Sequence, residues 1–218
     1  GTALRRDGTL ARADVEAALA LQRAGVIVTI VTGRLFSGTR WVAEALGIRG
    51  LVAVMNGCEV VEVESQRVQH GRYLGGDTLA HLRATLPSAP VASTLFRSGG
   101  IHHGHDSRHH RSAYELWTTD VHAHDDVYAL PAWSGDDILG VGVVAPAPAI
   151  THLRAALWPE LGERVGAMEF PLSTGGQFLA LHSSEDDKGT GLERIAQAYG
   201  LALDDCVAVG DWINDYQF

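Results

Sequence analysis

Apolar and polar positions along the chain repeat one unit, a helix that ends at a glycine and is followed by an apolar strand. Residues 14–24 carry apolar side chains at helical spacing, and VIVTIV at 26–31 is typical of a strand buried on both faces. The same order returns in a helix expected over 187–199 and a strand expected over 206–209. Repetition of this unit predicts an α/β fold with a doubly wound parallel sheet.

Between these repeats, the pattern changes at about residue 73 to the element order of an α+β module. We therefore expect a Rossmann-like core formed by residues 1–72 and 182–218, with residues 73–181 inserted as a second domain. The other predicted elements are helices at 39–46, 77–86 and 149–161, and strands at 51–55, 59–64, 91–96, 138–145, 165–170 and 178–182. The alternating residues of the strand at 59–64 predict a hairpin with one solvated face.

Composition places the chain among globular proteins, with 46% hydrophobic and 20% charged residues. The formal net charge of −9 argues against the basic surface that nucleic-acid binding requires. No apolar run is long enough to span a membrane, and no signal peptide opens the chain. Cys58 and Cys206 follow no metal-ligand spacing, so we expect buried, reduced thiols and a cytoplasmic protein. These features favour no particular oligomeric state.

Acidic and amide side chains gather where the predicted strand 206–209 ends. Asp211, Asn214 and Asp215 closely follow Gly210. In an open α/β sheet, the carboxyl ends of the strands form the edge at which ligands bind. Two carboxylates this close repel each other unless a cation lies among them, and hard oxygen ligands suit Mg²⁺. The stretch therefore predicts a magnesium site with Asp211 and Asp215 as ligands, and a solvated acidic turn is the alternative.

Two further groups are expected at the same edge of the sheet. Thr32 supplies a hydroxyl directly after the strand at 26–31. Lys188 lies at a predicted helix start and is the only lysine among 17 basic residues. This marks Lys188 for a role that the planar fork of arginine does not fill. A hydroxyl, an ammonium and a cation site together suit a phosphate group.

The order of these motifs resembles the haloacid dehalogenase superfamily, in particular the Cof-type phosphatases with a mixed α/β cap (class IIB). The resemblance covers nearly the whole chain, and the cap corresponds roughly to residues 73–181. The matching positions are Gly1-Thr2 at the end of the first motif Asp-x-Asp-Gly-Thr, Thr32-Gly33-Arg34 in the second, Asn56-Gly57 ahead of the cap, Lys188 in the third, and Gly210-Asp211 with Asn214-Asp215 in the fourth.

This resemblance implies a phosphatase acting on a small phosphorylated metabolite, such as a sugar phosphate. In the family, an aspartate attacks phosphorus to form an aspartyl phosphate, and a second aspartate two residues later acts as acid and base. The resemblance also implies Mg²⁺ held by Asp211, with Asp215 as a ligand or supporting partner. The catalytic and phosphate-binding positions it implies are Thr32, Gly33, Arg34, Asn56, Lys188 and Asn214, of which Lys188 would hold nucleophile and phosphate together.

Both aspartates of the first motif would precede Gly1, which is the main departure from the family. Asp7-Gly8-Thr9 spells a similar motif, but the residues before it are too few and too charged for a buried strand. We therefore interpret this stretch as a loop, and expect the chain to be a fragment, truncated at both ends, that is inactive alone. Without the family's central strand, the strands at 26–31 and 206–209 should be unpaired and about 10 Å apart.

Three alternatives remain open on the sequence. The scaffold could belong to a non-catalytic phosphate-binding or regulatory protein, or to a sugar-phosphate phosphomutase, because the core motifs do not fix the substrate. A third possibility is a metal site among the histidines of the polar stretch, although we favour a solvated loop because no cysteine or helical His-x-x-x-His accompanies them. These histidines are His102, His103, His105, His109, His110, His122 and His124.

Overall fold

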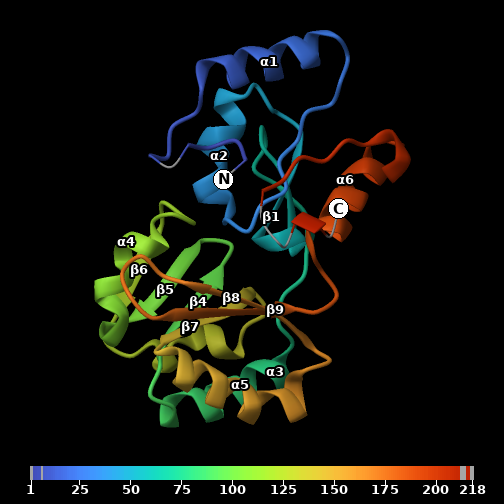
Figure 1. The fold of residues 1–218 in the computed structure, drawn as a ribbon. Helices are drawn as coiled ribbons and strands as arrows, with labels where there is room; N and C mark the ends of the chain where they lie inside the picture. The colour runs from blue at the N-terminus through green and yellow to red at the C-terminus, as the bar shows by residue number, and fades with distance from the viewer. Residues whose placement is uncertain (1, 6, 212–214, 217–218) are drawn as a thin grey trace. The chain divides into compact units, whose positions relative to one another are not determined.

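The computed structural model in Figure 1 describes residues 2–5, 7–211 and 215–216. The chain forms two compact units. Residues 1–71 and 186–218 make up the core unit, and residues 72–185 make up the inserted unit. The predicted insertion of residues 73–181 begins and ends within a few residues of these junctions. No helix in the described part of the chain is both long and apolar enough to cross a bilayer.

The described residues of the core unit form three α-helices, and each lies where helical spacing was found. They are α1 (Arg12–Arg23), α2 (Phe36–Ala45) and α6 (Lys188–Ala198). Ala18 of α1 and Val42 and Ala43 of α2 belong to one apolar cluster, whereas Ile195 of α6 belongs to another. The helical periodicity in the sequence therefore reflects burial of one side of each helix.

The core unit also contains an antiparallel three-stranded sheet. Its strands are β1 (Leu51–Val54), β2 (Glu59–Glu62) and β3 (Val68–Gly71), in the order β1-β2-β3. Strands β1 and β2 contribute side chains both to the cluster with α1 and α2 and to the cluster with α6. The predicted solvated face of the hairpin is therefore wrong at its start, because Glu59 is only 1% exposed.

The two predicted strands at 26–31 and 206–209 do not form as regular strands. Val31 makes one isolated parallel bridge to Ala53 of β1. Residues 206–209 have no strand structure, and Val207 and Val209 are 92% and 73% exposed. No backbone hydrogen bond joins the two segments in the described chain, as expected for strands that are not neighbours. An apolar run becomes a strand only when a partner satisfies its backbone groups, and these segments lack that partner on one or both edges.

The inserted unit is a six-stranded sheet with two long helices on one face (Figure 1). The strand order is β6-β5-β4-β7-β9-β8, and all neighbouring pairs are antiparallel except β5 with β6. The elements are α3 (Gly76–Thr85), β4 (Ala92–Arg97), β5 (Gly100–Gly104), α4 (Arg111–Tyr114), β6 (Val121–His124), β7 (Ile138–Ala145), α5 (Ala147–Leu161), β8 (Val165–Pro171) and β9 (Gln177–Ser183). Leucines of α3 and α5 pack with the sheet in one apolar cluster.

Strands β5 and β6 lie within the polar stretch that was expected to be a loop, so that expectation is wrong for these two segments. Both strands are histidine-rich, and His102 pairs in register with His122. Their hydrogen bonds come from neighbouring strands, whereas their side chains lack the apolar alternation by which strands are recognised. Of the two cysteines, Cys58 is buried as expected, but Cys206 is only half-buried.

Candidate functional site

The Thr32-Gly33-Arg34 turn lies directly against the end of β1. The amide of Thr32 donates to the carbonyl of Ala53 at 2.9 Å, and the amide of Asn56 donates to the carbonyl of Thr32 at 2.9 Å. The amide of Met55 donates to the carbonyl of Arg34 at 2.8 Å. These bonds bring together the Thr-Gly-Arg and Asn-Gly motifs, which are separated by more than twenty positions in the sequence.

Asn56 occupies a tight position within this turn. It is 3% exposed and has a left-handed backbone, with φ of 55° in the 3₁₀ turn η1 (Met55–Gly57). A Cβ at Gly33 would lie 3.1 Å from Oδ1 of Asn56, so a side chain at Gly33 would press on the amide group. Arg34 is half-buried, and this burial lowers the pKa of its guanidinium. The Arg34 amide also donates to Oγ1 of Thr32 at 3.2 Å.

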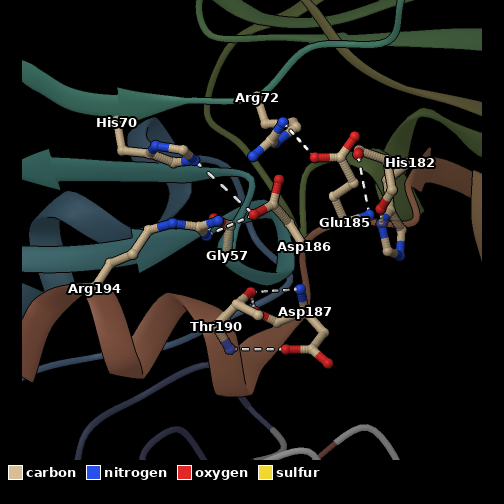
Figure 2. A network of polar contacts seen from close by, with 10 residues as sticks. Gly57, His70, Arg72, His182, Glu185, Asp186, Asp187, Thr190 and Arg194 are labelled. Carbon is tan, nitrogen blue, oxygen red and sulfur yellow. Dashed lines mark hydrogen bonds and ion pairs between the residues drawn. The ribbon is translucent and has the colours of Figure 1, made fainter.

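The start of α6 is fixed by a capping box. Oδ1 of Asp187 accepts from the amide of Thr190 at 2.8 Å, while the amide of Asp187 donates to Oγ1 of Thr190 at 2.9 Å (Figure 2). Two otherwise unsatisfied amides at the helix start are paired in this way. Lys188 is the first residue of α6. The positive φ of Gly57 and its close approach to the carbonyl of Asp187 leave no room for a Cβ at that position.

Lys188 starts a chain of polar contacts that ends at Thr2. Its ammonium pairs with Oδ1 of Asp215, and the two side chains are 10% and 13% exposed. Oδ2 of Asp215 accepts from the amide of Asp211 at 2.8 Å, and Oδ1 of Asp211 accepts from the hydroxyl of Thr2 at 2.8 Å. A Cβ at Gly210 would overlap the Asp215 side chain, which accounts for the glycine at the start of this motif.

The site residues expected from the sequence therefore fall into two groups within the core unit. Thr32, Gly33, Arg34 and Asn56 form the first, and Lys188, Asp211 and Asp215 form the second. The groups meet where Gly57 packs on Asp187, between Asn56 and Lys188. Asn214 lies outside the described residues.

The Asp7-Gly8-Thr9 stretch is a surface turn, which confirms its interpretation as a loop. A bridge between Leu4 and Leu10 closes it, and Asp7 is exposed. Oδ1 of Asp7 accepts from the hydroxyl and the amide of Thr9 at 2.7 and 3.0 Å. These hydrogen bonds, with that of the hydroxyl the stronger, lower the pKa of Asp7. A carboxylate held in a turn by its own neighbours is poorly placed to attack phosphorus.

The described residues contain no group of three or more histidine, cysteine or acidic side chains that could hold a metal ion. This includes the histidines of β5 and β6. The ring of His102 stacks on those of His122 and His124, with centroids 4.7 and 5.1 Å apart. Nδ1 of His102 also lies 2.9 Å from Nε2 of His124, so these two ring nitrogens pair with each other. His102 is half-buried and His103 is only 1% exposed, so the expectation of a solvated loop is wrong for β5.

Asp211 and Asp215 differ in how they could take part in a cation site. Both Asp215 oxygens are engaged, one by Lys188 and one by the Asp211 amide. Asp211 is exposed and therefore accessible to an incoming ion. Mg²⁺ is commonly held by one or two carboxylates together with water and substrate phosphate, which fits this pair.

One polar network near the site was not anticipated. Asp186, whose side chain has no exposure, pairs with Arg194 of α6 and lies near His70 of β3 (Figure 2). The sequence shows only an acidic run before Lys188, which by itself indicates a solvated turn. No periodicity distinguishes a buried carboxylate from an exposed one.

The fold and the motif order together define a haloacid dehalogenase-like hydrolase. The profile of that family matches residues 1–218, so the chain belongs to it. This finding and the shared fold of the solved structures below confirm the α/β fold class and the resemblance to Cof-type class IIB proteins.

Individual relatives share a quarter or less of their aligned residues with this chain. An HMP-PP phosphatase of Yersinia enterocolitica is 25% identical over 220 residues, which cover 99% of this chain and 76% of the relative. A haloacid dehalogenase-like hydrolase from Bacteroides thetaiotaomicron has a TM-score of 0.82 at 18% identity, covering 99% of this chain and 80% of that one. A sugar phosphatase of haloacid dehalogenase subclass IIB has a TM-score of 0.70 at 14% identity, covering 94% and 75%.

Proposed function

We propose that this chain provides the phosphate-binding and metal-binding groups of a Mg²⁺-dependent phosphatase that acts on small phosphorylated metabolites such as sugar phosphates. Relatives that are an HMP-PP phosphatase and a sugar phosphatase support this class of substrate. Cys58 and Cys206, which form no disulfide in the described structure, support a reducing compartment, namely the cytoplasm.

One observation carries the proposal: a nearly buried ammonium is held by a carboxylate beside a second, exposed carboxylate. Lys188, Asp215 and Asp211 make this arrangement, and the hydroxyl of Thr2 completes it. A buried lysine with only a structural role needs one anion to balance its charge. An additional accessible carboxylate within the same chain of contacts is what a cation bound beside a phosphate requires.

Each residue has a distinct role in this proposal. Lys188 would donate to phosphate oxygens and to the attacking carboxylate, and Asp215 holds its ammonium in place. Thr32 and Asn56, connected by backbone hydrogen bonds, would donate to the phosphate from the other side, with Gly33 and Arg34 in the same turn. Asp211 would bind Mg²⁺ directly. Asp215, which accepts a hydrogen bond from the Asp211 amide, would hold Asp211 in place. Mg²⁺, when bound, neutralises charge on the phosphate.

Asp7, the aspartate of the one Asp-Gly-Thr stretch, is held in a surface turn by Thr9 and is not proposed as the attacking group. Phosphoryl transfer would therefore require an aspartate that enters from a strand joined ahead of Gly1. The same chain without that aspartate would still bind phosphate and Mg²⁺. Binding and hydrolysis can thus be tested separately.

The experiment compares the 218-residue chain with a chimera in which the Asp-x-Asp segment of the Yersinia HMP-PP phosphatase precedes Gly1. We expect the chimera to release phosphate from a panel of phosphorylated metabolites when Mg²⁺ is present, and the chain alone to release none. EDTA should abolish the release. A folded chimera that hydrolyses nothing on the panel would reject the phosphatase function, and phosphate binding without turnover would favour the regulatory alternative.

The metal assignment is tested in both proteins by titration calorimetry with Mg²⁺. Asp211→Asn should weaken Mg²⁺ binding by roughly a hundredfold, because it removes a charged oxygen ligand. Asp204→Asn, which removes another exposed aspartate of the same unit, is the matched control and should bind normally. Equal weakening in both variants would show that the effect is general electrostatics and would remove Asp211 from the site.

A further inference from the structure

A buried ionic network ties the start of α6 to the turn that contains Asn56. Asp186 directly precedes the capping residue Asp187, and its carboxylate has no solvent exposure. Nη1 of Arg194, on α6, lies 2.5 Å from Oδ1 of Asp186. Figure 2 shows the guanidinium reaching from the helix toward this carboxylate. A carboxylate buried to this degree is stable as an anion only when a cation accompanies it.

The same guanidinium also reaches the turn after Asn56. Nη1 of Arg194 donates to the carbonyl of Gly57 in a long hydrogen bond of 3.4 Å. Arg194 therefore contacts a residue just before its own helix and a residue of η1. Both contacts are made by the same nitrogen, Nη1, whose two N–H groups point in fixed directions within the plane of the guanidinium.

Helix α6 and the turn are packed so closely that a small shift of one must move the other. Gly57 touches the carbonyl of Asp187, and a Cβ on Gly191 would lie 2.9 Å from Cα of Gly57. No side chain separates the two backbones at this point. His70 of β3 faces the network from the other side, with Nε2 3.9 Å from Oδ1 of Asp186.

We propose that the Asp186–Arg194 pair is a positioning device that holds the first turn of α6 against η1 and thereby keeps the Lys188 ammonium beside Asp215. Asp186 acts through the helix backbone and touches no reacting group. The importance of this positioning for catalysis rests on the proposed phosphatase function, in which Lys188 contacts the phosphate and the nucleophile at the same time. The positioning itself is a property of the core unit and can be measured without turnover.

The chain contains its own reporter for this measurement, because Lys188 is its only lysine. Acetylation of the Lys188 amine by acetic anhydride, followed by mass spectrometry of the peptide, measures how well the ammonium is held. The nearly buried pair with Asp215 should protect it strongly in the unsubstituted chain. Asp186→Asn and Arg194→Gln should each raise the acetylation rate by about tenfold, because the first turn of α6 opens locally more often.

Two controls separate positioning from general loss of stability. Val42→Ala, in the cluster with α2, destabilises the same unit without touching the network. Arg49→Gln removes an exposed ion pair with Glu64. Both should leave Lys188 protected when rates are compared at equal distance from the urea midpoint. Equal acetylation in Asp186→Asn and Val42→Ala under that condition would overturn the proposal.

A double variant keeps the proposal testable if either single variant fails to fold. Asp186→Asn with Arg194→Gln removes both charges of the pair, so neither is left without its partner, and the double variant should fold while exposing Lys188 as the single variants do. Normal protection in that folded double variant would also overturn the proposal. Failure of the chimera to hydrolyse phosphate esters would leave these acetylation rates unaffected, so loss of the phosphatase function and loss of the positioning role are distinguishable.

Discussion

At the scale of single residues, burial distinguishes side chains that look equivalent in the sequence. Asp211 and Asp215 are both acids of one motif, yet Asp215 is engaged at both oxygens and Asp211 is exposed. The sequence places both acids in one motif and predicts that both lie at the cation site. It does not show that one is engaged and the other exposed, because that depends on the contact between Asp215 and the distant Lys188.

His102 gives a prediction at this scale. Burial, and then the positive charge of Arg97 and the neighbouring His122 and His124, lower the pKa of His102 from 6.5 to about 4, opposed by Asp137. Between those pH values the unfolded chain binds a proton more readily than the folded chain does. Stability from neutral His102 is thus complete above pH 6.5 and is lost as the pH falls toward 4.

Urea unfolding as a function of pH measures this loss. His102 is partly exposed, so solvent screening reduces the expected loss to about 1 kcal/mol between neutral pH and the folded-state pKa. His102→Gln should lose correspondingly less stability over that range than the unsubstituted chain. His152→Gln, at an exposed position of α5, is the control and should follow the unsubstituted chain. Identical pH profiles for all three proteins would contradict the prediction.

At the scale of elements, local pattern was sufficient for helices and for strands in the middle of a sheet. The α5 periodicity and the uninterrupted apolar run of β7 required no knowledge of their neighbours. Strand formation at 26–31 and 206–209 depends instead on a partner elsewhere in the chain, and β5 and β6 owe their hydrogen bonds to adjacent strands. Non-local pairing is what single-sequence patterns leave out.

The contact between η1 and α6 predicts that two left-handed glycines will respond differently to the same substitution. Gly57 has a φ of 94° and no room for a Cβ against Asp187, whereas Gly25 has a φ of 88° and nothing within 4 Å. Gly25→Ala should cost about 1 kcal/mol for the backbone alone. Gly57→Ala should cost about 3 kcal/mol, because overlap with the helix start adds to that strain.

Urea unfolding of the core unit in the two alanine variants gives the comparison directly. Similar destabilisation by both would mean that the turn and the helix can move apart at little cost. That result would also weaken the inferred positioning of Lys188, since the positioning device depends on the same close approach.

At the scale of the whole molecule, the two units differ in how completely their sheets are formed. The inserted unit has six strands paired in one sheet. Among its described residues, the core unit has three strands, and the two apolar segments that precede the Thr32 and Asp211 motifs form no regular strand. Thr32 and Asp211 closely follow these two segments in the chain. If the segments become ordered, the positions of these two site residues become fixed as well.

A strand supplied to the core unit should therefore order both segments. The amides of Val207, Ala208 and Val209 make no backbone hydrogen bond within the described chain, and Val207 and Val209 are highly exposed. Their hydrogen exchange should be fast in the 218-residue chain. In the chimera that carries the Asp-x-Asp segment ahead of Gly1, an added strand would pair with residues 206–209 and slow exchange at these amides by at least about a hundredfold.

The amides of β7, already paired on both edges, are the internal control and should exchange at the same rate in both proteins. Slower exchange confined to residues 206–209 and 26–31 would place the added strand between them and explain why neither segment forms a ladder alone. Unchanged exchange in a chimera that nevertheless hydrolyses phosphate esters would contradict this account, because the attacking aspartate would then reach the site without forming a sheet.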